Sequence, residues 1–245
     1  MKLKVDTIPV NELTSNDVER MFALMQCYYL NVSQQQFLKD LSDKDYVIAL
    51  YDDDILRGFS TWMTFGHENQ GCKVNVIFSG DTIIERDYWS SLALPLAWGH
   101  LMLTTLTNKP EQPLYWLLTS KGYKTYRFLP VFFREFYPCP QVKTPPFEKA
   151  LAVELGQQKY GDRFNAETWV VKARPEDQLL RSGVADISLQ QLKNEHIAFF
   201  ARTNPGHTQG DELICLAHCH PDNLKPFILR KLLAYEIVEH QPIPK

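Results

Sequence analysis

The segment 85–91, Glu-Arg-Asp-Tyr-Trp-Ser-Ser, carries residue types that could bind an anion. Arg86 supplies a guanidinium group, and Ser90 and Ser91 supply hydroxyl and amide groups. The segment joins a strand-like apolar run to a helix-like run, so unpaired N–H groups of a helix N-terminus are expected here. It contains no glycine, and Trp89 stands where an anion would need close contact with the backbone. The expected chemistry is phosphate or pyrophosphate binding.

A second group of cations follows the next apolar run. Lys121, Lys124 and Arg127 recur every three residues, with Arg134 further along. On a helix or irregular turn they would present one cationic face, suited to a phosphate group. A solvated helix face is the alternative interpretation.

Three residues are candidates for proton transfer. Asp81 and Glu85 lie at or just past the end of a long predicted strand, where either carboxylate could accept a proton from an attacking amine. Turn or capping roles are the alternative for both. His67, in the polar segment 66–71, is another candidate base, and an exposed loop histidine is the ordinary alternative.

The segment 215–220, Cys-Leu-Ala-His-Cys-His, resembles a metal-binding cluster. On a strand, however, Cys215 and Cys219 would lie about 13 Å apart, too far to bind one ion. The segment 211–217 has a strand pattern, which favours a core strand and no metal site. A helix would permit the metal site.

Two further segments have a functional and an ordinary interpretation. The turn-rich segment 204–211 contains two glycines that could approach a ligand, or it is a plain connection. A series of aromatic residues could line an acyl tunnel or fill the core: Phe128, Phe132, Phe133, Phe136 and Tyr137.

Composition places these residues in a globular chain. Of 245 residues, 44% are apolar and 22% charged, with a net charge of -3, which fits one large domain or one domain with an appended subdomain. This charge provides no broad footprint for nucleic acid or a membrane surface. An apolar leader or a run of roughly 18 apolar residues is not found, so a cytoplasmic protein is expected. Five irregularly spaced cysteines do not form a disulfide framework.

Hydrophobic periodicity predicts the elements that must position the candidate residues. Capping signatures at Asn16 with Glu19 and at Ser33 with Gln36 predict two helices. Strands are predicted at 2–10, 46–51, 55–65, 74–84 and 114–118, a helix at 91–106, and helical structure at 123–137. After the proline-rich stretch 138–146, helices are predicted at 147–160, 188–202 and 222–237, and strands at 168–172 and 211–217.

This order of elements over residues 1–138 resembles the GCN5-related N-acetyltransferase (GNAT) superfamily. The resemblance implies an α/β fold with a central mixed, mostly antiparallel sheet flanked by helices, and residues 139–245 as a C-terminal α/β extension packed on or completing the same domain. In the family, an Arg/Gln-x-x-Gly-x-Gly/Ala turn holds the pyrophosphate of acetyl-CoA. Segment 86–91 corresponds to it, with the arginine kept and both glycines replaced. Either the turn has widened, or the usual cofactor pose is lost.

The resemblance also implies roles for individual residues. Amides near Ser79, Gly80 and Asp81 would polarise a thioester carbonyl. Arg86, Ser90 and Ser91 would hold phosphate, assisted by Lys121 and Lys124. The tyrosine that acts as general acid in the family corresponds to Phe133, which cannot donate a proton, so Tyr126 or Tyr123 would have to serve.

The expected function is transfer of an acyl group to an amine. The donor would be acetyl-CoA, another acyl-CoA or an acyl carrier protein, and a longer acyl chain would match the acyl-homoserine-lactone and N-acyl amino acid synthase branches. The alternative is a catalytically inactive GNAT-fold module that binds a small ligand or a protein partner. A metal is not expected.

Overall fold

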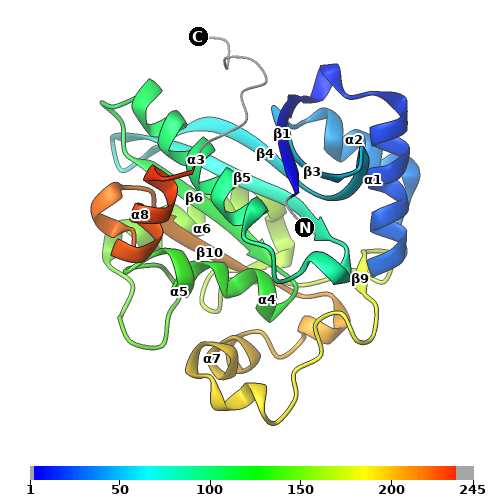
Figure 1. Cartoon of the computed structure of the whole chain (residues 1–245). Coiled ribbons are helices and arrows are strands. Elements are labelled where there is room, and N and C mark those ends of the chain that lie inside the picture. Colours follow the sequence, from blue (N-terminus) through cyan, green and yellow to red (C-terminus); the bar gives the residue numbers. More distant parts are fainter. Residues whose placement is uncertain (1–2, 236–245) are drawn as a thin grey trace.

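The computed structural model describes residues 3–235. Their central element is an eight-stranded sheet (Figure 1). The strand order is β1-β3-β4-β5-β6-β10-β8-β7, with β5 and β6 parallel and the other described pairs antiparallel. The strands are β1 (Lys4–Pro9), β3 (Tyr46–Asp52), β4 (Ile55–Asn69), β5 (Cys72–Ile84), β6 (Leu114–Ser120), β7 (Phe164–Asn165), β8 (Val170–Val171) and β10 (Glu212–His218). Two short strands, β2 (Tyr29–Leu30) and β9 (Leu179–Leu180), pair separately.

Helices cover both faces of the sheet. The alternation along β3 shows this, because Ile48 and Leu50 belong to one buried cluster and Val47 and Ala49 to another. The first face carries α3 (Ala93–Asn108), α4 (Tyr123–Tyr126), α5 (Phe128–Phe132) and α8 (Pro226–Leu233). The second carries α1 (Ser15–Tyr28), α2 (Gln34–Ser42) and α6 (Pro146–Tyr160). Helix α7 (Glu195–Thr203) packs against α4.

The sequence pattern located most elements but misplaced the start of the first helix. The N-cap is Thr14, whose hydroxyl accepts from the Asp17 amide at 3.1 Å while the Asp17 carboxylate accepts from the Thr14 amide. This reciprocal pair defines the first turn, so the predicted cap at Asn16 is wrong by two residues. The predicted cap at Ser33 is confirmed, since its hydroxyl accepts from the Gln36 amide at 3.3 Å.

The sequence suggested a loop at 66–71, but residues 66–69 belong to β4. Strands β4 and β5 pair as far as Asn69 and Cys72, and only Gln70 and Gly71 form the turn, both with positive φ. Such two-residue turns match the twist of antiparallel strands. His67 therefore lies on β4, where its Nε2 lies 3.2 Å from a carboxylate oxygen of Glu154 on α6.

Residues beyond 139 contribute to the same sheet, because β10 pairs with β6 along its length. The predicted helix 188–202 is wrong in its first half. The Asn194 side chain accepts from the amides of His196 and Ile197 and so starts α7 anew. The helical segment predicted at 123–137 ends at Phe132, and the last helix is shorter than predicted; residues 236–237 of that prediction lie outside the described residues.

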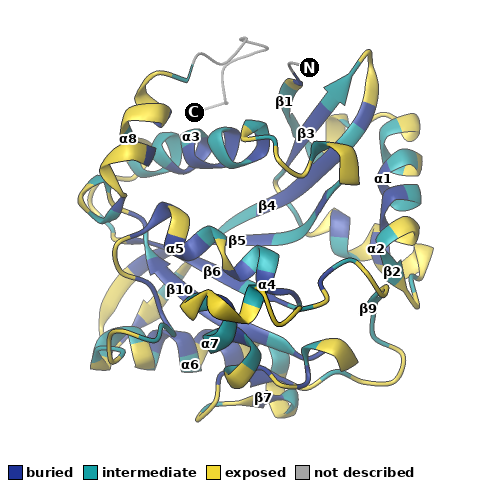
Figure 2. Ribbon diagram, turned by 60° about the horizontal axis from the view of Figure 1, so that its bottom comes forward, coloured by how far each residue is buried: buried dark blue, intermediate teal, exposed yellow. Residues whose placement is uncertain are grey.

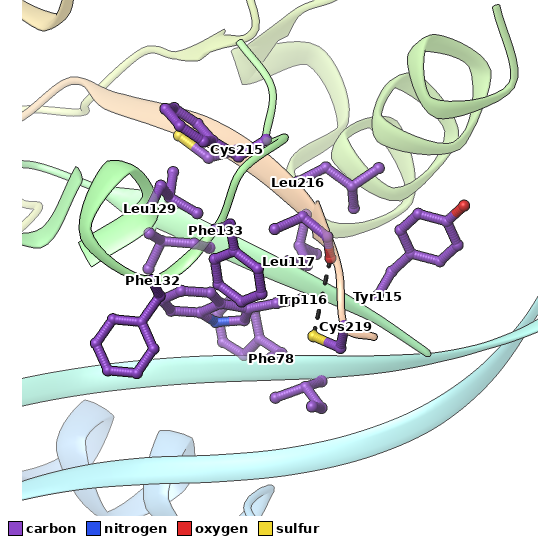
Figure 3. Packing of buried hydrophobic residues seen from close by; sticks show 14 of the residues in the cluster. Phe78, Tyr115, Trp116, Leu117, Leu129, Phe132, Phe133, Cys215, Leu216 and Cys219 are labelled. Carbon is purple, nitrogen blue, oxygen red and sulfur yellow. Dashed lines mark hydrogen bonds between the residues drawn. The ribbon is translucent and has the colours of Figure 1, made fainter. Parts of the chain in front are cut away.

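The central strands are buried along most of their length (Figure 2). The close view in Figure 3 shows Trp116, Phe133, Cys215 and Cys219 among the apolar side chains there. Both cysteines are fully buried, as the core-strand interpretation expected. In the described part of the chain, no side-chain cluster of three or more potential ligands could hold a metal ion, and no helix is long and apolar enough to cross a bilayer.

Candidate functional site

The parallel strands β5 and β6 separate after Ser79. Their pairing covers residues 75–79 of β5 and 114–118 of β6. Beyond that point, among the residues that the structure describes, β5 continues to Ile84 paired only with β4, and β6 continues to Ser120 paired only with β10. An opening therefore forms between two strands in the middle of the sheet.

A β-bulge lies where the strands separate. Trp62 of β4 pairs with Ser79, but Ser60 pairs with Thr82, so Gly80 and Asp81 together face the single residue between them. A bulge bends its strand and increases the local twist, which accounts for the departure of β5 from β6.

Gly80 is required by the packing at this bulge. A Cβ atom on residue 80 would lie 2.5 Å from the Thr61 hydroxyl and 3.0 Å from Cε of Lys44. Thr61 is buried, so its hydroxyl has little space to move away, whereas the Lys44 side chain lines the cavity and can move. A glycine at residue 80 thus avoids a clash with Thr61 and leaves the backbone of the bulge uncovered.

A cavity of about 1290 Å³ fills the opening. On one face of the sheet its walls come from the start of α3 and from α4, α5 and α8; on the other they come from α2, β10 and the end of α6. It is rich in cations, although the whole chain has a net charge of -3. The charged residues of its walls are Lys44, Lys121, Lys124, Arg127, Lys159, Arg163, Arg174, Lys225, Lys231, Asp40, Asp81, Glu176, Asp177 and Glu212.

The turn after β5 is wider than a direct strand-to-helix connection. A 3-10 turn at Arg86–Tyr88 follows the strand, and α3 begins only at Ala93, two residues later than predicted. Trp89 folds back, its Nε1 donating to the Ile84 carbonyl at 2.8 Å, and the Ser91 hydroxyl accepts from the Ala93 amide at 3.1 Å. The widened turn is one of the two arrangements that the missing glycines predicted.

Four features together identify the fold. They are the antiparallel hairpin of β4 and β5, the bulge in the long strand β5, the turn from β5 into α3, and the parallel strand β6 that separates from β5 at the bulge. The chain has a GNAT-like fold. The fold prediction is therefore confirmed, with β10, β8 and β7 added to the far edge of the sheet.

Comparisons with known proteins gave structural matches alone. No protein-family model and no curated protein matches the sequence. A probable N-acyltransferase of Enterococcus faecalis V583 has 12% identity and a TM-score of 0.44, with 89% of this chain and 66% of that chain covered, so the match spans just under two thirds of the Enterococcus protein. Escherichia coli ElaA has 15% identity and a TM-score of 0.37, covering 59% and 93%. The E. coli GNAT family N-acetyltransferase YhbS, solved with CoA, has 14% identity and a TM-score of 0.36, covering 52% and 69%.

Asp81 is the acidic residue of the bulge. Burial of the carboxylate raises the pKa of Asp81 from 3.8 to about 6; nearby Lys44 opposes the shift and Asp40 adds to it. The side chain still reaches solvent through the cavity. Asp81 is thus ionised at neutral pH and is a stronger base than an ordinary carboxylate.

Lys124 and Trp89 form a contact that sequence reasoning missed. The Lys124 Nζ lies 3.3 Å from the centre of the Trp89 ring, and the Arg86 guanidinium carbon lies 5.3 Å from it. Burial, with the nearby Arg86 charge, lowers the pKa of Lys124. Trp89 was expected only to obstruct the approach of an anion to the backbone of the turn. Its ring in fact also holds a cation at the cavity wall.

Six of the predicted site residues line the cavity together: Gly80, Asp81, Ser90, Ser91, Lys121 and Lys124. Lys121 is already paired with Glu212 at 2.7 Å. Two others do not line this cavity. Arg86 is exposed beside Trp89, and the Glu85 carboxylate forms ion pairs with Arg20 and Arg57.

Ser79 lies beneath the cavity and is almost fully buried. Its hydroxyl accepts from Nε1 of Trp98 at 2.9 Å and from Nε1 of Trp116 at 3.0 Å. Both indoles and Ser79 line a small apolar pocket of about 30 Å³, which shares Thr82 and Phe128 with the large cavity. Ser79 thus organises the floor of the opening.

The structure does not bring Tyr126 to the cavity. Its ring is fully buried and its hydroxyl donates to the Pro138 carbonyl at 3.0 Å. Phe133 is also fully buried and packs against Trp116 (Figure 3). Tyr123 does line the cavity, and its hydroxyl accepts a hydrogen bond from the side-chain amide of Gln191. Burial raises the pKa of Tyr123.

The remaining candidates divide between the cavity wall and the scaffold. Of the aromatic series, Phe128 and Phe132 line the cavity, whereas Phe136 and Tyr137 are buried elsewhere. The segment 204–211 closes on itself through the Asn204 side chain, which donates to the backbone carbonyl of residue 211 at 2.9 Å. That segment is a braced connection between α7 and β10.

Proposed function

We propose that the protein is an N-acyltransferase that moves an acyl group from a coenzyme A thioester to an amine. The proposal rests above all on one observation: the cavity crosses the sheet at the Gly80–Asp81 bulge, where β5 has no partner on its β6 side. A ligand can reach the edge of the strand there from both faces of the sheet.

The donor fits the face of the sheet that carries α3. The widened turn offers Ser90 and Ser91, and Lys124 with Arg127 adds positive charge for phosphate groups. The unpaired edge of β5 would bind the pantetheine arm and direct backbone amides of the bulge at the thioester carbonyl. An acyl carrier protein would present the same phosphopantetheine arm and is the alternative donor.

In the proposed reaction, the amine nitrogen attacks the thioester carbonyl carbon, a C–N bond forms and the C–S bond breaks. Asp81 takes the proton that the nitrogen loses, since its raised pKa makes it a suitable base. The thiolate leaves and takes up one proton. Tyr123, the first residue of α4, lines the cavity and is the proposed donor of that proton. The products are one amide and one free thiol.

The second candidate is a binding module that has lost catalysis. Two buried side chains favour this candidate. Phe133 has no hydroxyl, and the Tyr126 hydroxyl already donates a hydrogen bond to the Pro138 carbonyl. Such a protein would retain the cavity and bind a thioester, another small ligand or a protein partner. The cytoplasmic location expected from the sequence stays a prediction.

Binding and turnover separate the two candidates. Calorimetric titration with acetyl-CoA and longer acyl-CoA tests binding, and thiol release with amide detection by mass spectrometry tests turnover over an amine panel. We expect binding together with stoichiometric thiol and amide, reduced strongly in Asp81→Asn. Tight binding without amide over the panel would leave the binding module, and absence of thioester binding would contradict the transferase.

A further inference from the structure

The face of the cavity opposite α3 holds two lysines over one aromatic ring. The Nζ atom of Lys159 lies 4.0 Å from the centre of the Phe78 ring, and that of Lys44 lies 5.8 Å from the same centre. Lys44 belongs to the segment after α2, whereas Lys159 lies at the end of α6. Two separate parts of the chain therefore bring positive charge to one point beside the bulge.

Neither ammonium group has an ionic partner among residues 3–235. No carboxylate oxygen lies within 4.0 Å of either Nζ, and Lys44 donates instead to the backbone carbonyl of Asp40 at 2.7 Å. Other cations of this face are neutralised, since Lys121 pairs with Glu212 and Arg163 pairs with Asp177. Both ammonium groups can thus form a direct ion pair with a ligand.

The two lysines also act on each other and on the bulge. The pKa of Lys159 is lowered by burial first and by the like charge of Lys44 second, while the carboxylates of Glu212, Asp40 and Asp43 oppose the shift. A Cβ atom on Gly80 would lie 3.0 Å from Cε of Lys44, so the Lys44 side chain runs directly past the bulge. An anion between the two ammonium groups would relieve their repulsion.

We infer that the acyl acceptor carries an anionic group, a carboxylate or a phosphate, in addition to its amine. Lys44 and Lys159 bind the oxyanion, and the amine faces Asp81. This inference rests on the proposed transferase function and narrows its substrate class. A diamine or an uncharged amine lacks the group that these lysines recognise.

The test uses acceptors matched in length, with acetyl-CoA as donor. Beta-alanine, 3-aminopropanol and 1,3-diaminopropane differ only in the group opposite the amine, and 2-aminoethyl phosphate against ethanolamine tests the phosphate. We expect kcat/KM at least tenfold higher for an anionic acceptor than for its uncharged partner, and the better of the two anions identifies the oxyanion. Equal or higher values for the uncharged and dicationic amines would overturn the inference.

Three variants connect that preference to the lysines. Lys44→Gln and Lys159→Gln should each raise the KM for the anionic acceptor about tenfold. Lys44→Gln also removes a charge that lowers the pKa of Asp81, so Lys159→Gln is the cleaner measure of acceptor binding. Lys149→Gln, an exposed position on the same helix as Lys159, is the matched control. Unchanged KM in both cavity variants would contradict the assignment.

Failure of the inference is distinguishable from failure of the transferase proposal. If no amine of the panel is acylated, the proposed function fails. If the uncharged amines are acylated as well as the anionic ones, and Lys159→Gln leaves the KM for the anionic acceptors unchanged, the transferase stands and the anionic acceptor class is wrong.

Discussion

The ammonium nitrogen of Lys124 lies 3.3 Å from the centre of the Trp89 indole ring. The lysine comes from α4 and the tryptophan from the turn before α3, so this contact joins two segments that flank the proposed donor side of the cavity. Glycines are absent from the turn, and we interpret the paired indole and ammonium as its alternative means of attracting a phosphate.

Lys124→Ala should weaken the binding of coenzyme A. Loss of one cation at the phosphate site is expected to raise the Kd about tenfold, or ~1.4 kcal/mol. Titration calorimetry at low ionic strength measures the change, and Lys109→Ala, an exposed lysine at the end of α3, is the control. Equal affinity in both variants would show that the phosphate binds elsewhere.

Asp81 should control the pH dependence of the reaction. Its pKa is raised to about 6, so its proton is lost, and the base becomes available, as the pH rises through that value. We expect kcat/KM to fall below about pH 6 and Asp81→Asn to lower kcat by about 100-fold or more. A wild-type profile without an inflection near this pH, or an Asn variant at full activity, would exclude Asp81 as the base.

Gly80→Ala tests whether the bulge needs a residue without a side chain. The added Cβ would meet the Thr61 hydroxyl at 2.5 Å, so we expect a loss of about 1–3 kcal/mol in the free energy of unfolding. Gly66→Ala on β4 is the matched control, because a Cβ there has no neighbour within 4 Å. Urea denaturation compares the two variants, and equal stability would mean that the bulge adapts freely.

Ser79→Ala should destabilise the floor of the cavity. The change leaves the indole N–H groups of Trp98 and Trp116 without their acceptor, at about 1–3 kcal/mol for each buried group. Ser60→Ala breaks a single contact, the 2.8 Å hydrogen bond between its hydroxyl and that of Thr82, and should cost less. Thermal unfolding ranks the two, and a smaller loss for Ser79→Ala would contradict this role.

The fold was largely predictable because its central elements have strong local patterns. Alternating apolar residues marked β3 and β4, and the Ser33 cap marked α2. The bulge was not predictable, because it depends on the register between β4 and β5 rather than on either strand alone. Pairing of β10 with β6 joins segments about a hundred residues apart and leaves no local signal.

The site was predictable in part for the same reason. Gly80 and Asp81 follow the apolar run 74–78, which indicated a site nearby, although both residues lie within β5 and not at its end. The burial of Tyr126 was not visible, since helical spacing does not tell which side of a short helix meets the core. Contacts between distant segments, such as Lys124 on Trp89 and Lys159 on Phe78, form only in the folded chain.

The central claim is that a thioester binds where β5 and β6 separate. A crystal structure of the protein with a thioether analogue of acetyl-CoA tests it most directly. The account predicts the sulfur atom in the opening beyond Ser79, beside Gly80 and Asp81, with the phosphates near Ser90, Ser91 and Lys124. An analogue bound at another surface, or an opening that stays empty at saturating analogue, would contradict the account.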